Sequence, residues 1–500
     1  MAYCHYERLT ALDCTFLDHE DGNAHMHIGA IALFDVGPLA REGGGIRFDS
    51  ILEHVEAALR KNDRFLQKLA RIPGLNQPVW VDDDKFNLRY HVRHTCLPAP
   101  GDERVLKRLA GRIMSEELDR GKPLWELWFV EGVEGDRFAI ISKIHHSLSV
   151  GPTGDDLFSV ILDTDSVASS EAAGKWLPRP APSGSRLVVD DLKRRARLPF
   201  SLLSIGTRAI ADAGKTAASV RDAFTGIGEV LRTSVFPASE TPFNQPLGPH
   251  RRFDWIRSDL AEVKTVRRKL GGTVNDVVLC VVAGAVRRFM VGRGLQVSDL
   301  DFRVVVPMSL KSAGATGEAE SQIAMQLTPL PIDEANPRRR LDRIVETTHE
   351  QKTATRTRGS EILTEIADWT HTGFVAQLAH FGVQTRIANF VVTNVSGPTE
   401  ARYLLGARMQ EVFPIVSLAA NQGLGIALFS YAGGLYWGLN ADRDLMPDLH
   451  EFVAALDTEF EQLRRLALEK RRTKPAAKAR ATRRKPVAAA GIRTEPKPPQ

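Results

Sequence analysis

Hydrophobic and polar residues follow two patterns along the first 165 residues, one typical of strands and one typical of helices. Ala30–Phe34 and Leu127–Val130 are short apolar runs that predict strands. Asp49–Lys61 and Arg104–Leu118 instead carry apolar side chains at every third or fourth position, which predicts amphipathic helices. Strands that alternate with helices in this way predict a mixed α/β fold.

The clearest strand pattern, Asp136–Ile144, ends directly before two adjacent histidines, His145 and His146. Neighbouring side chains on a strand point to opposite faces, so one imidazole can face a cleft while the other faces the interior. An imidazole titrates near pH ~6.5 and is a ready proton acceptor at neutral pH. Taken alone, such a pair is more often a surface or core pair than a catalytic base, so the rest of the chain has to decide.

A second region of alternating patterns runs from Arg251 to about Leu463. Thr273, with Asp276 three residues later, has the spacing of a capping box at the start of a helix. That helix is nearly all apolar as far as Phe289 and is expected to be buried. Composition further predicts strands at Phe302–Pro307 and Phe390–Asn394, and a hairpin at Ile426–Leu439 around Gly433 and Gly434.

Residues 166–245 separate these two regions and differ from them in composition. Several prolines, the basic cluster Lys193–Arg195 and an Ala/Gly-rich stretch up to Val235 follow one another. This segment is either a connector of loose helices or an amphipathic element that seeks a surface. The sequence therefore predicts an N-terminal domain, 1–165, and a C-terminal domain, 246–463, joined by the connector. A pocket is expected at their boundary, where binding sites are common.

The net charge of +5 is unevenly distributed along the 500 residues. Residues 464–500 hold 13 Lys or Arg and two Glu, a net charge of +11, so the rest of the chain carries −6. A segment rich in Lys, Arg, Ala and Pro cannot bury a core, and we expect a disordered basic tail. Either this tail is merely solvated, or it attracts anionic lipid headgroups with about 1 kcal/mol per basic residue. It has no aromatic residue to stack on bases, which argues against nucleic acid as a partner.

Composition also bounds the class and compartment of the protein. Hydrophobic residues make up 43% and charged residues 25%, as in soluble globular proteins. No apolar run approaches the ~20 residues that cross a bilayer, and the N-terminus lacks the pattern of a secretory signal. The cysteines show no CxxC spacing and fit reduced thiols. We expect a cytoplasmic protein, with peripheral contact at the inner membrane face or at lipid bodies through the basic tail. The four cysteines are Cys4, Cys14, Cys96 and Cys280.

Other common chemistries lack their sequence motifs. The chain has no Gly-x-Ser-x-Gly nucleophile elbow, no P-loop and no dinucleotide-binding glycine fingerprint. A zinc site would need a third ligand at suitable spacing beside His91 and His94. These two histidines lie in a strand-like basic stretch and are expected to be exposed. We therefore expect no metal and no bound cofactor.

Eight short motifs stand in order along the chain from Leu9 to Leu449. They are Leu12-Asp13 with Phe16, Met26-His27-Ile28-Gly29, Pro123-Leu124-Trp125, the double histidine, Pro249-His250-Arg251-Arg252-Phe253, Asn275-Asp276-Val277-Val278-Leu279, Thr393-Asn394-Val395-Ser396-Gly397-Pro398 and Ala441-Asp442-Arg443-Asp444. Each is weak alone, but together and in this order they are specific. On these motifs the chain resembles the bacterial wax ester synthase/acyl-CoA:diacylglycerol acyltransferases, within the chloramphenicol acetyltransferase-like superfamily. The resemblance excludes the tail.

The resemblance implies two chloramphenicol acetyltransferase-like domains that face each other across a tunnel with the active site. It implies that His146 is the general base and that His145, its motif partner, orients it. Acyl-CoA would be the co-substrate, and diacylglycerol or a fatty alcohol the acceptor, so triacylglycerol or wax esters would be the product. Asn275 is a candidate donor to the oxyanion intermediate, but helix capping beside Thr273 explains it equally well. Structural roles are expected for Gly151, Pro123, Leu124, Trp125 and Asp276.

The chain departs from the family pattern at Val150, where the motif has an aspartate. In the superfamily that aspartate ties the histidine loop to a basic partner. Removing one member of a buried pair costs about 3–5 kcal/mol when the other charge stays behind, so the partner is expected to be lost or solvated too. Either packing holds the loop and His146 still works, or the chain is a weakened or inactive paralogue that binds lipid or acts as a scaffold. A condensation-type enzyme of the same superfamily is a further alternative, and it would be expected beside carrier domains.

Overall fold

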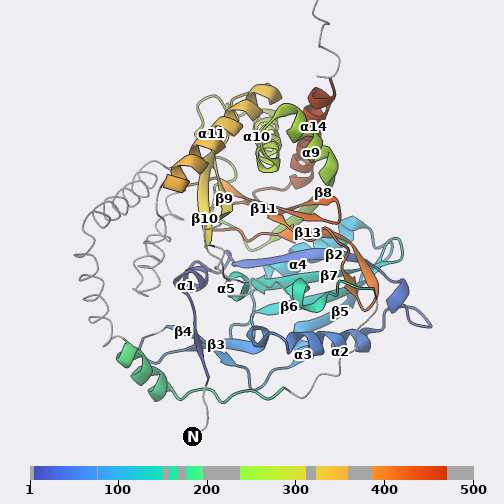
Figure 1. Ribbon diagram of the computed structural model, residues 1–500, viewed down its shortest axis with the longest axis vertical. Coiled ribbons are helices and arrows are strands. Elements are labelled where there is room, and N and C mark those ends of the chain that lie inside the picture. Colours follow the sequence, from blue (N-terminus) through green and yellow to red (C-terminus); the bar gives the residue numbers. More distant parts are fainter. Residues whose placement is uncertain are drawn as a thin grey trace, which may run out of the picture.

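Two mixed six-stranded sheets, one above the other, form the framework of the molecule (Figure 1). This computed structural model describes residues 5–75, 77–149, 157–166, 176–194, 237–310, 322–357 and 386–469. Helices cover the face of each sheet that points away from the other sheet. The mixed α/β class predicted from the alternating patterns is confirmed.

The N-terminal sheet carries the strand that leads to the double histidine. Its order is β12 (Tyr403–Leu404), β13 (Ala407–Ile415), β2 (His27–Asp35), β7 (Arg137–His145), β6 (Trp125–Val133) and β5 (Val92–Cys96). Strands β5 and β6 run parallel, and the other neighbours run antiparallel. The register places His27 of β2 directly opposite His145 of β7. The three strands predicted in the first 165 residues are confirmed as parts of β2, β6 and β7.

The C-terminal sheet is built from the second alternating region. Its order is β10 (Gln322–Pro329), β9 (Arg303–Leu310), β11 (Phe390–Ser396), β14 (Leu424–Tyr431), β15 (Gly434–Asp442) and β8 (Arg251–Asp259). Strands β9, β11 and β14 run parallel, and the remaining pairs are antiparallel. The predicted hairpin is formed by β14 and β15. Gly433 lies in its turn with a φ of 90°, a conformation that glycine adopts without strain.

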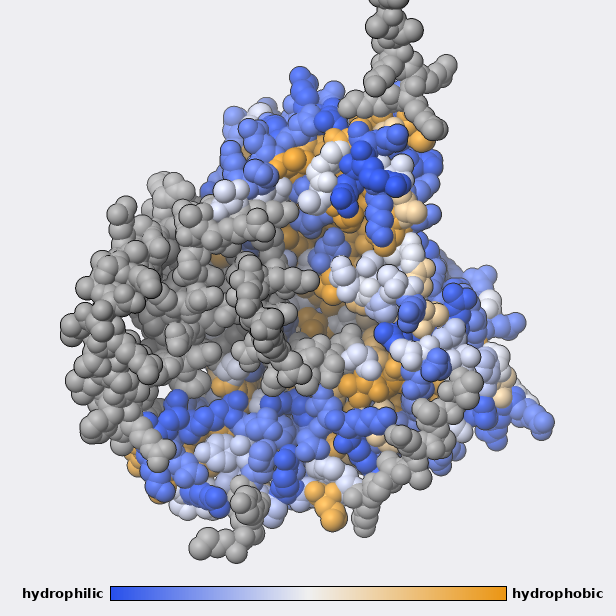
Figure 2. Space-filling view, viewed as in Figure 1, coloured by the Kyte–Doolittle hydropathy of each residue, from blue (hydrophilic) through white to orange (hydrophobic). Residues whose placement is uncertain are grey.

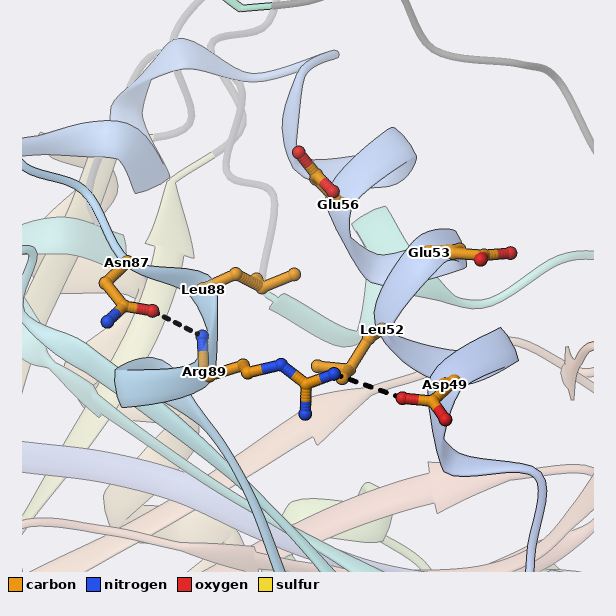
Figure 3. Close-up of a pocket in the computed structure, with 7 residues that line it drawn as sticks. All are labelled: Asp49, Leu52, Glu53, Glu56, Asn87, Leu88 and Arg89. Carbon is orange, nitrogen blue, oxygen red and sulfur yellow. Dashed lines mark hydrogen bonds and ion pairs between the residues drawn. The ribbon is translucent and has the colours of Figure 1, made fainter.

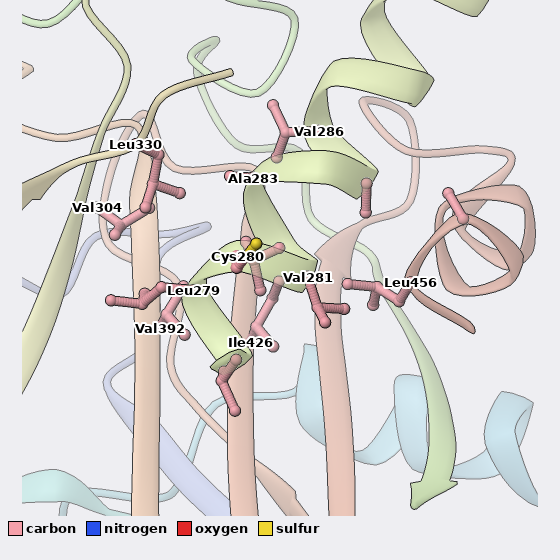
Figure 4. Close-up of a cluster of buried hydrophobic side chains, with 14 of the residues drawn as sticks. Leu279, Cys280, Val281, Ala283, Val286, Val304, Leu330, Val392, Ile426 and Leu456 are labelled. Carbon is pink, nitrogen blue, oxygen red and sulfur yellow. The ribbon is translucent and has the colours of Figure 1, made fainter. Parts of the chain in front are cut away.

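The outer face of the C-terminal sheet is covered, among the described residues, by α9 (Leu260–Leu270), α10 (Val274–Gly292), α11 (Pro337–Thr357) and α14 (Leu449–Glu469) (Figure 1). Helix α10 packs at the centre of this layer. Figure 4 shows its side chains together with Val304 of β9, Val392 of β11 and Ile426 of β14, all buried. Every residue of α10 from Asp276 to Val286 is buried, which confirms the buried helix predicted there.

The N-terminal sheet is covered by α2 (Phe48–Leu59) and α3 (Leu88–His91), whereas α4 (Glu103–Ser115) lies between the two sheets (Figure 1). The apolar side of α4 belongs to a buried cluster that contains Ile141 of β7 and Trp255 of β8. In Figure 2 apolar residues are visible at the waist between the two units, whereas polar residues dominate their outer faces. Further elements within the described residues include α1 (Ala11–Asp18), α5 (His146–Ser149), α6 (Leu157–Ile161), η1 (Gly37–Leu39), η2 (Asp63–Leu66), β1 (Glu7–Arg8), β3 (Gln67–Arg71) and β4 (Pro78–Asp82).

One segment crosses the boundary predicted between the domains. Strands β12 and β13 lie within residues 246–463, yet they complete the N-terminal sheet, with β13 antiparallel to β2. Val412 and Phe413 of β13 are buried there, so this strand covers the edge of β2 with apolar side chains. A period of two predicts a strand but not its partner, so chain order alone cannot show which sheet a strand joins.

Parts of the predicted connector and tail lie within the described residues. Arg179 holds the segment 176–194 against the N-terminal unit, because its backbone N–H and its guanidinium donate to Asp82 at 2.8–2.9 Å. Helix α14 continues to Glu469, so the first six residues of the predicted disordered tail are helical instead. The rest of the tail, 470–500, lies outside the described residues.

Candidate active site

The double histidine lies where β7 ends and α5 begins, and neighbouring segments hold both of its peptide groups. The N–H of His145 donates to the carbonyl of Leu124 at 2.9 Å. The N–H of His146 donates to the carbonyl of Met26 at 2.8 Å. Leu124 and Met26 both belong to motifs singled out from the sequence. Three of those motifs therefore meet at this junction.

His145 is the interior member of the pair, with 1% of its surface exposed. Its Nδ1 lies 2.7 Å from the hydroxyl of Ser147 and accepts a hydrogen bond from the Ser147 N–H at 3.1 Å. Its Nε2 lies 3.3 Å from Oε1 of Glu20. Both ring nitrogens of His145 thus have polar neighbours, and the ring is fixed in the interior.

His146 is partly exposed, and its ring stacks on Phe16 of α1. The ring centroids are 3.8 Å apart and the planes are inclined by 22°. Burial lowers the pKa of His146 to about 4. The imidazole is therefore neutral at physiological pH and has a lone pair that can accept a proton.

Glu20, in the loop before β2, is a residue beside the double histidine that the sequence analysis did not single out. Besides His145, its Oε1 lies 3.7 Å from Nε2 of His27 and accepts a hydrogen bond from the Met26 N–H at 2.8 Å. Its Oε2 accepts a hydrogen bond from Arg120 at 2.7 Å. Burial alone would raise the pKa of Glu20, but His145 and Arg120 together hold that pKa well below its usual range. No local pattern in the sequence could have revealed these contacts, because they depend on the register that sets His27 against His145.

The Pro123-Leu124-Trp125 motif supports the histidines from the side of β6. Trp125 is fully buried, and its indole N–H donates to the carbonyl of Phe65 at 2.7 Å. His91 stacks on the Trp125 ring and donates from Nδ1 to the Trp125 carbonyl at 2.8 Å. The expectation that His91 is exposed is wrong, because it ends α3 and faces the core, with 1% exposed. His94 is exposed as expected.

Asp276 and Asn275 are neighbours at the start of α10 with different environments. The predicted capping box is confirmed: Thr273 caps α10, and Asp276 accepts from the N–H and the hydroxyl of Thr273 at 2.7 and 2.8 Å. The other oxygen of Asp276 accepts from the hydroxyl of Thr348 at 2.8 Å. Asn275 takes no part in this cap. Its side chain is partly buried.

A buried ion pair joins two further motifs where the units meet. Arg251 at the start of β8 lies 3.5 Å from Asp442 at the end of β15, and both side chains are buried. The Arg251 guanidinium also donates to the carbonyl of Asn23, in the loop that contains Glu20 and leads to β2. The C-terminal unit therefore holds the loop that approaches the double histidine from the N-terminal unit.

Two of the predicted site residues, Val150 and Gly151, lie outside the described residues. Among the residues that are described, no group of three or more His, Cys, Asp or Glu side chains is arranged to hold a metal ion. No described helix is both long enough and apolar enough to span a bilayer.

A polar depression of about 370 Å³ lies between α2 and α3, on a different part of the N-terminal unit (Figure 3). An ion pair of 3.1 Å between Arg89 and the exposed Asp49 spans it. The carboxylates of Glu53 and Glu56 also line it. This depression contains neither histidine of the pair, so the chemistry indicated by the sequence lies elsewhere.

Known proteins share both the sequence and the fold. The family described as the wax ester synthase/diacylglycerol acyltransferase catalytic domain matches residues 9–278, and the WS/DGAT C-terminal domain matches residues 321–464. A probable diacylglycerol O-acyltransferase of Mycobacterium tuberculosis is 31% identical over 482 residues, which cover 93% of this chain and 96% of that protein. A putative diacylglycerol O-acyltransferase of Mycobacterium bovis has the same identity and coverage.

Solved structures share the two-domain architecture. The wax ester synthase/diacylglycerol acyltransferase from Marinobacter aquaeolei VT8 matches with a TM-score of 0.65 and 24% identity, covering 92% of this chain and 99% of that chain. The first condensation domain of the CDA synthetase matches with a TM-score of 0.52 and 13% identity, covering 93% and 96%. At sequence identities of 24% and 13%, these matches show a similarity of fold alone.

Proposed function

Because the chain belongs to the wax ester synthase/diacylglycerol acyltransferase family, we propose that it transfers a long-chain acyl group from acyl-CoA to the hydroxyl of diacylglycerol. The product is triacylglycerol, and fatty alcohols are a second class of acceptor that would give wax esters. The enzyme is an O-acyltransferase of the chloramphenicol acetyltransferase-like superfamily. Acyl-CoA is a co-substrate in this reaction.

His146 is the general base in this proposal. A hydroxyl is too weakly acidic to attack a thioester unaided, so the imidazole removes its proton as the oxygen adds to the acyl carbonyl. The tetrahedral intermediate then collapses, the carbon–sulfur bond breaks, and His146 returns the proton to the departing thiolate. General base catalysis contributes about 10²–10⁴-fold to such reactions.

The position of His146, directly after β7 and with its ring stacked on Phe16, is the observation that carries the proposal, and burial there keeps the imidazole neutral. Its pKa of about 4 leaves the ring unprotonated throughout the neutral range. When it takes the proton, the imidazolium forms next to the developing oxyanion. Opposite charges that appear together in a site with little water stabilise each other. Asn275 is the candidate donor to that oxyanion.

The test is release of free coenzyme A by the purified protein supplied with long-chain acyl-CoA and diacylglycerol. His146→Ala is expected to abolish release. The matched control is His450→Ala, at an exposed position of α14, which is expected to leave the rate unchanged. Equal release by the wild-type protein and His146→Ala would refute the role of His146 as base. No release by either would refute the acyltransfer itself.

A second candidate function follows from Val150, which replaces the motif aspartate. A protein that retains the fold but has lost its turnover would bind lipid or act as a scaffold. Val150→Asp distinguishes the two candidates. A large gain in coenzyme A release across a panel of acceptor alcohols would show that the missing carboxylate limits this chain. An unchanged high rate would show that packing holds the loop well enough.

The basic tail is proposed to bring the enzyme to anionic lipid surfaces, either the inner membrane face or a lipid body. Because α14 extends to Glu469, the tail is removed cleanly by ending the chain there. Deletion of residues 470–500 is expected to reduce sedimentation with anionic vesicles while turnover of soluble acceptors stays intact. Unchanged sedimentation would reduce the tail to a solvated segment.

A further inference from the structure

We infer that Glu20 is a positioning residue for His146. It acts on His146 indirectly, through three separate contacts with other residues. The inference rests on the proposed function, because it assigns a role around the same base. Glu20 lies in the loop between α1 and β2, and 11% of its side chain is exposed. Each of its contacts ends at a different part of the structure around the double histidine.

The first contact fixes His145, directly before the base. The backbone N–H of Ser147 can only donate, so Nδ1 of His145 must accept and the ring proton lies on Nε2. That Nε2–H faces Oε1 of Glu20 at 3.3 Å. The Ser147 N–H therefore selects this tautomer, and the negative charge of Glu20 lies next to its protonated nitrogen. The ring of His145 thus connects the residues before and after His146 and holds both in place.

The second contact fixes the backbone of His146 itself. Oε1 of Glu20 accepts a hydrogen bond from the N–H of Met26 at 2.8 Å. The carbonyl of the same Met26 accepts the N–H of His146 at 2.8 Å. Met26 is thus held on one side by Glu20, and holds the base on the other side.

The third contact reaches the surface on which the His146 ring lies. Oε2 of Glu20 accepts from Arg120 at 2.7 Å, and Arg120 also donates to the carbonyl of Leu17 at 3.1 Å. Leu17 follows Phe16 in α1, and Phe16 stacks on His146. Arg120 therefore links the carboxylate to the helix that carries the stacking partner.

Only a charged carboxylate satisfies all three contacts. Its oxygens accept hydrogen bonds from the Met26 N–H and the Arg120 guanidinium, and its negative charge lies 3.3 Å from Nε2 of His145. A glutamine would keep one accepting oxygen and would turn an NH₂ group toward one of these donors. Glu20→Gln therefore breaks at least one contact with almost no change in shape.

The experiment compares Glu20→Gln with Glu56→Gln, an exposed glutamate of α2, in steady-state kinetics. Glu20→Gln is expected to lower kcat about 10- to 100-fold with little change in KM, since a small displacement of a reacting group has effects of this size. Glu56→Gln is expected to match the wild type. A kcat within twofold of wild type for Glu20→Gln, or an equal loss in both variants, would overturn the inference.

A second measurement separates failure of this inference from failure of the proposed function. ¹⁵N-histidine spectra of the wild-type protein are expected to show His145 protonated on Nε2 at neutral pH, and the Nε2 resonance of His145 is expected to shift in Glu20→Gln while the fold is retained. His145 protonated on Nδ1 in the wild type would overturn the inference even if acyltransfer is observed. If the spectra are as expected but no coenzyme A is released, the positioning role of Glu20 stands and the proposed reaction is refuted.

Discussion

The rings of Phe16 and His146 lie face to face, 3.8 Å apart, although one belongs to α1 and the other begins α5. Phe16 covers one face of the imidazole with an apolar surface. Water that would otherwise solvate an imidazolium is excluded from that side, and burial of this kind lowers the pKa of the ring. One aromatic residue from a separate helix thus helps to keep the base neutral.

Phe16→Ala is expected to raise the pKa of His146 from about 4 toward its ordinary value, because water then reaches the exposed ring face. The shift is read from a histidine NMR titration, together with the pH profile of coenzyme A release. Phe48→Ala is the control, since Phe48 stacks on His94 elsewhere in the N-terminal unit. An unchanged His146 titration in Phe16→Ala would show that other groups set its pKa.

Asn275 and Asp276 are expected to respond in opposite ways to replacement by alanine. Asp276→Ala removes the acceptor for Thr273 and leaves the Thr348 hydroxyl with only its longer contact of 3.3 Å to the Val345 carbonyl, at a cost of about 1–3 kcal/mol in the free energy of unfolding. Asn275→Ala leaves this cap intact. If Asn275 donates to the oxyanion, its removal lowers kcat about 10²–10³-fold.

Urea denaturation and steady-state kinetics of both variants check this pair. The two positions adjoin, so each variant controls for general disturbance of α10. Loss of stability in Asn275→Ala with unchanged kcat would restore a structural role for that residue and remove it from the oxyanion site.

The individual helices and strands were predictable because burial of an element produces a characteristic pattern of apolar residues in the sequence. The alternation of Asp136–Ile144 predicts a strand, whose two faces the structure then shows to be buried, and the apolar run after Thr273 predicts a buried helix. Both patterns arise within one element. They hold without any knowledge of what packs against it.

The contacts between elements were not predictable in this way. The partner of β13 is a strand about 380 residues earlier in the chain, and no local pattern encodes that pairing. Glu20 lies in a polar loop that looks solvated in the sequence, and its role appears only once β2 and β7 are set side by side. His91 was misjudged for the same reason, since its stacking partner Trp125 is 34 residues away.

Trp125→Phe is expected to lower the stability of the protein rather than to change the chemistry. The substitution leaves the Phe65 carbonyl without its 2.7 Å hydrogen bond in a fully buried site and opens a small cavity, a loss of about 2–4 kcal/mol. Trp128→Phe on the same strand is the control, because Trp128 is partly exposed and donates to Glu126, two residues away. Equal denaturation midpoints for the two variants would contradict the structural role of Trp125.

His91 is expected to make the stability of the protein fall between pH 6.5 and pH 4. Burial lowers its pKa in the folded protein to about 4, whereas the unfolded chain has the ordinary value near ~6.5. Above pH 6.5 the ring is neutral in both states. As the pH falls through this window, the unfolded state binds a proton that the folded state does not, so unfolding is favoured by up to about 3 kcal/mol.

The variant His91→Phe separates this contribution from that of other titrating groups. Phenylalanine can stack on Trp125 but cannot donate to its carbonyl, so the variant is expected to be less stable than wild type at pH 7.5, by about 1 kcal/mol. Because it has no proton to gain in the unfolded state, its stability falls less on acidification, and the two curves converge or cross by pH 4.5. Parallel stability curves over this window, measured by urea denaturation, would mean that His91 titrates normally in the folded protein.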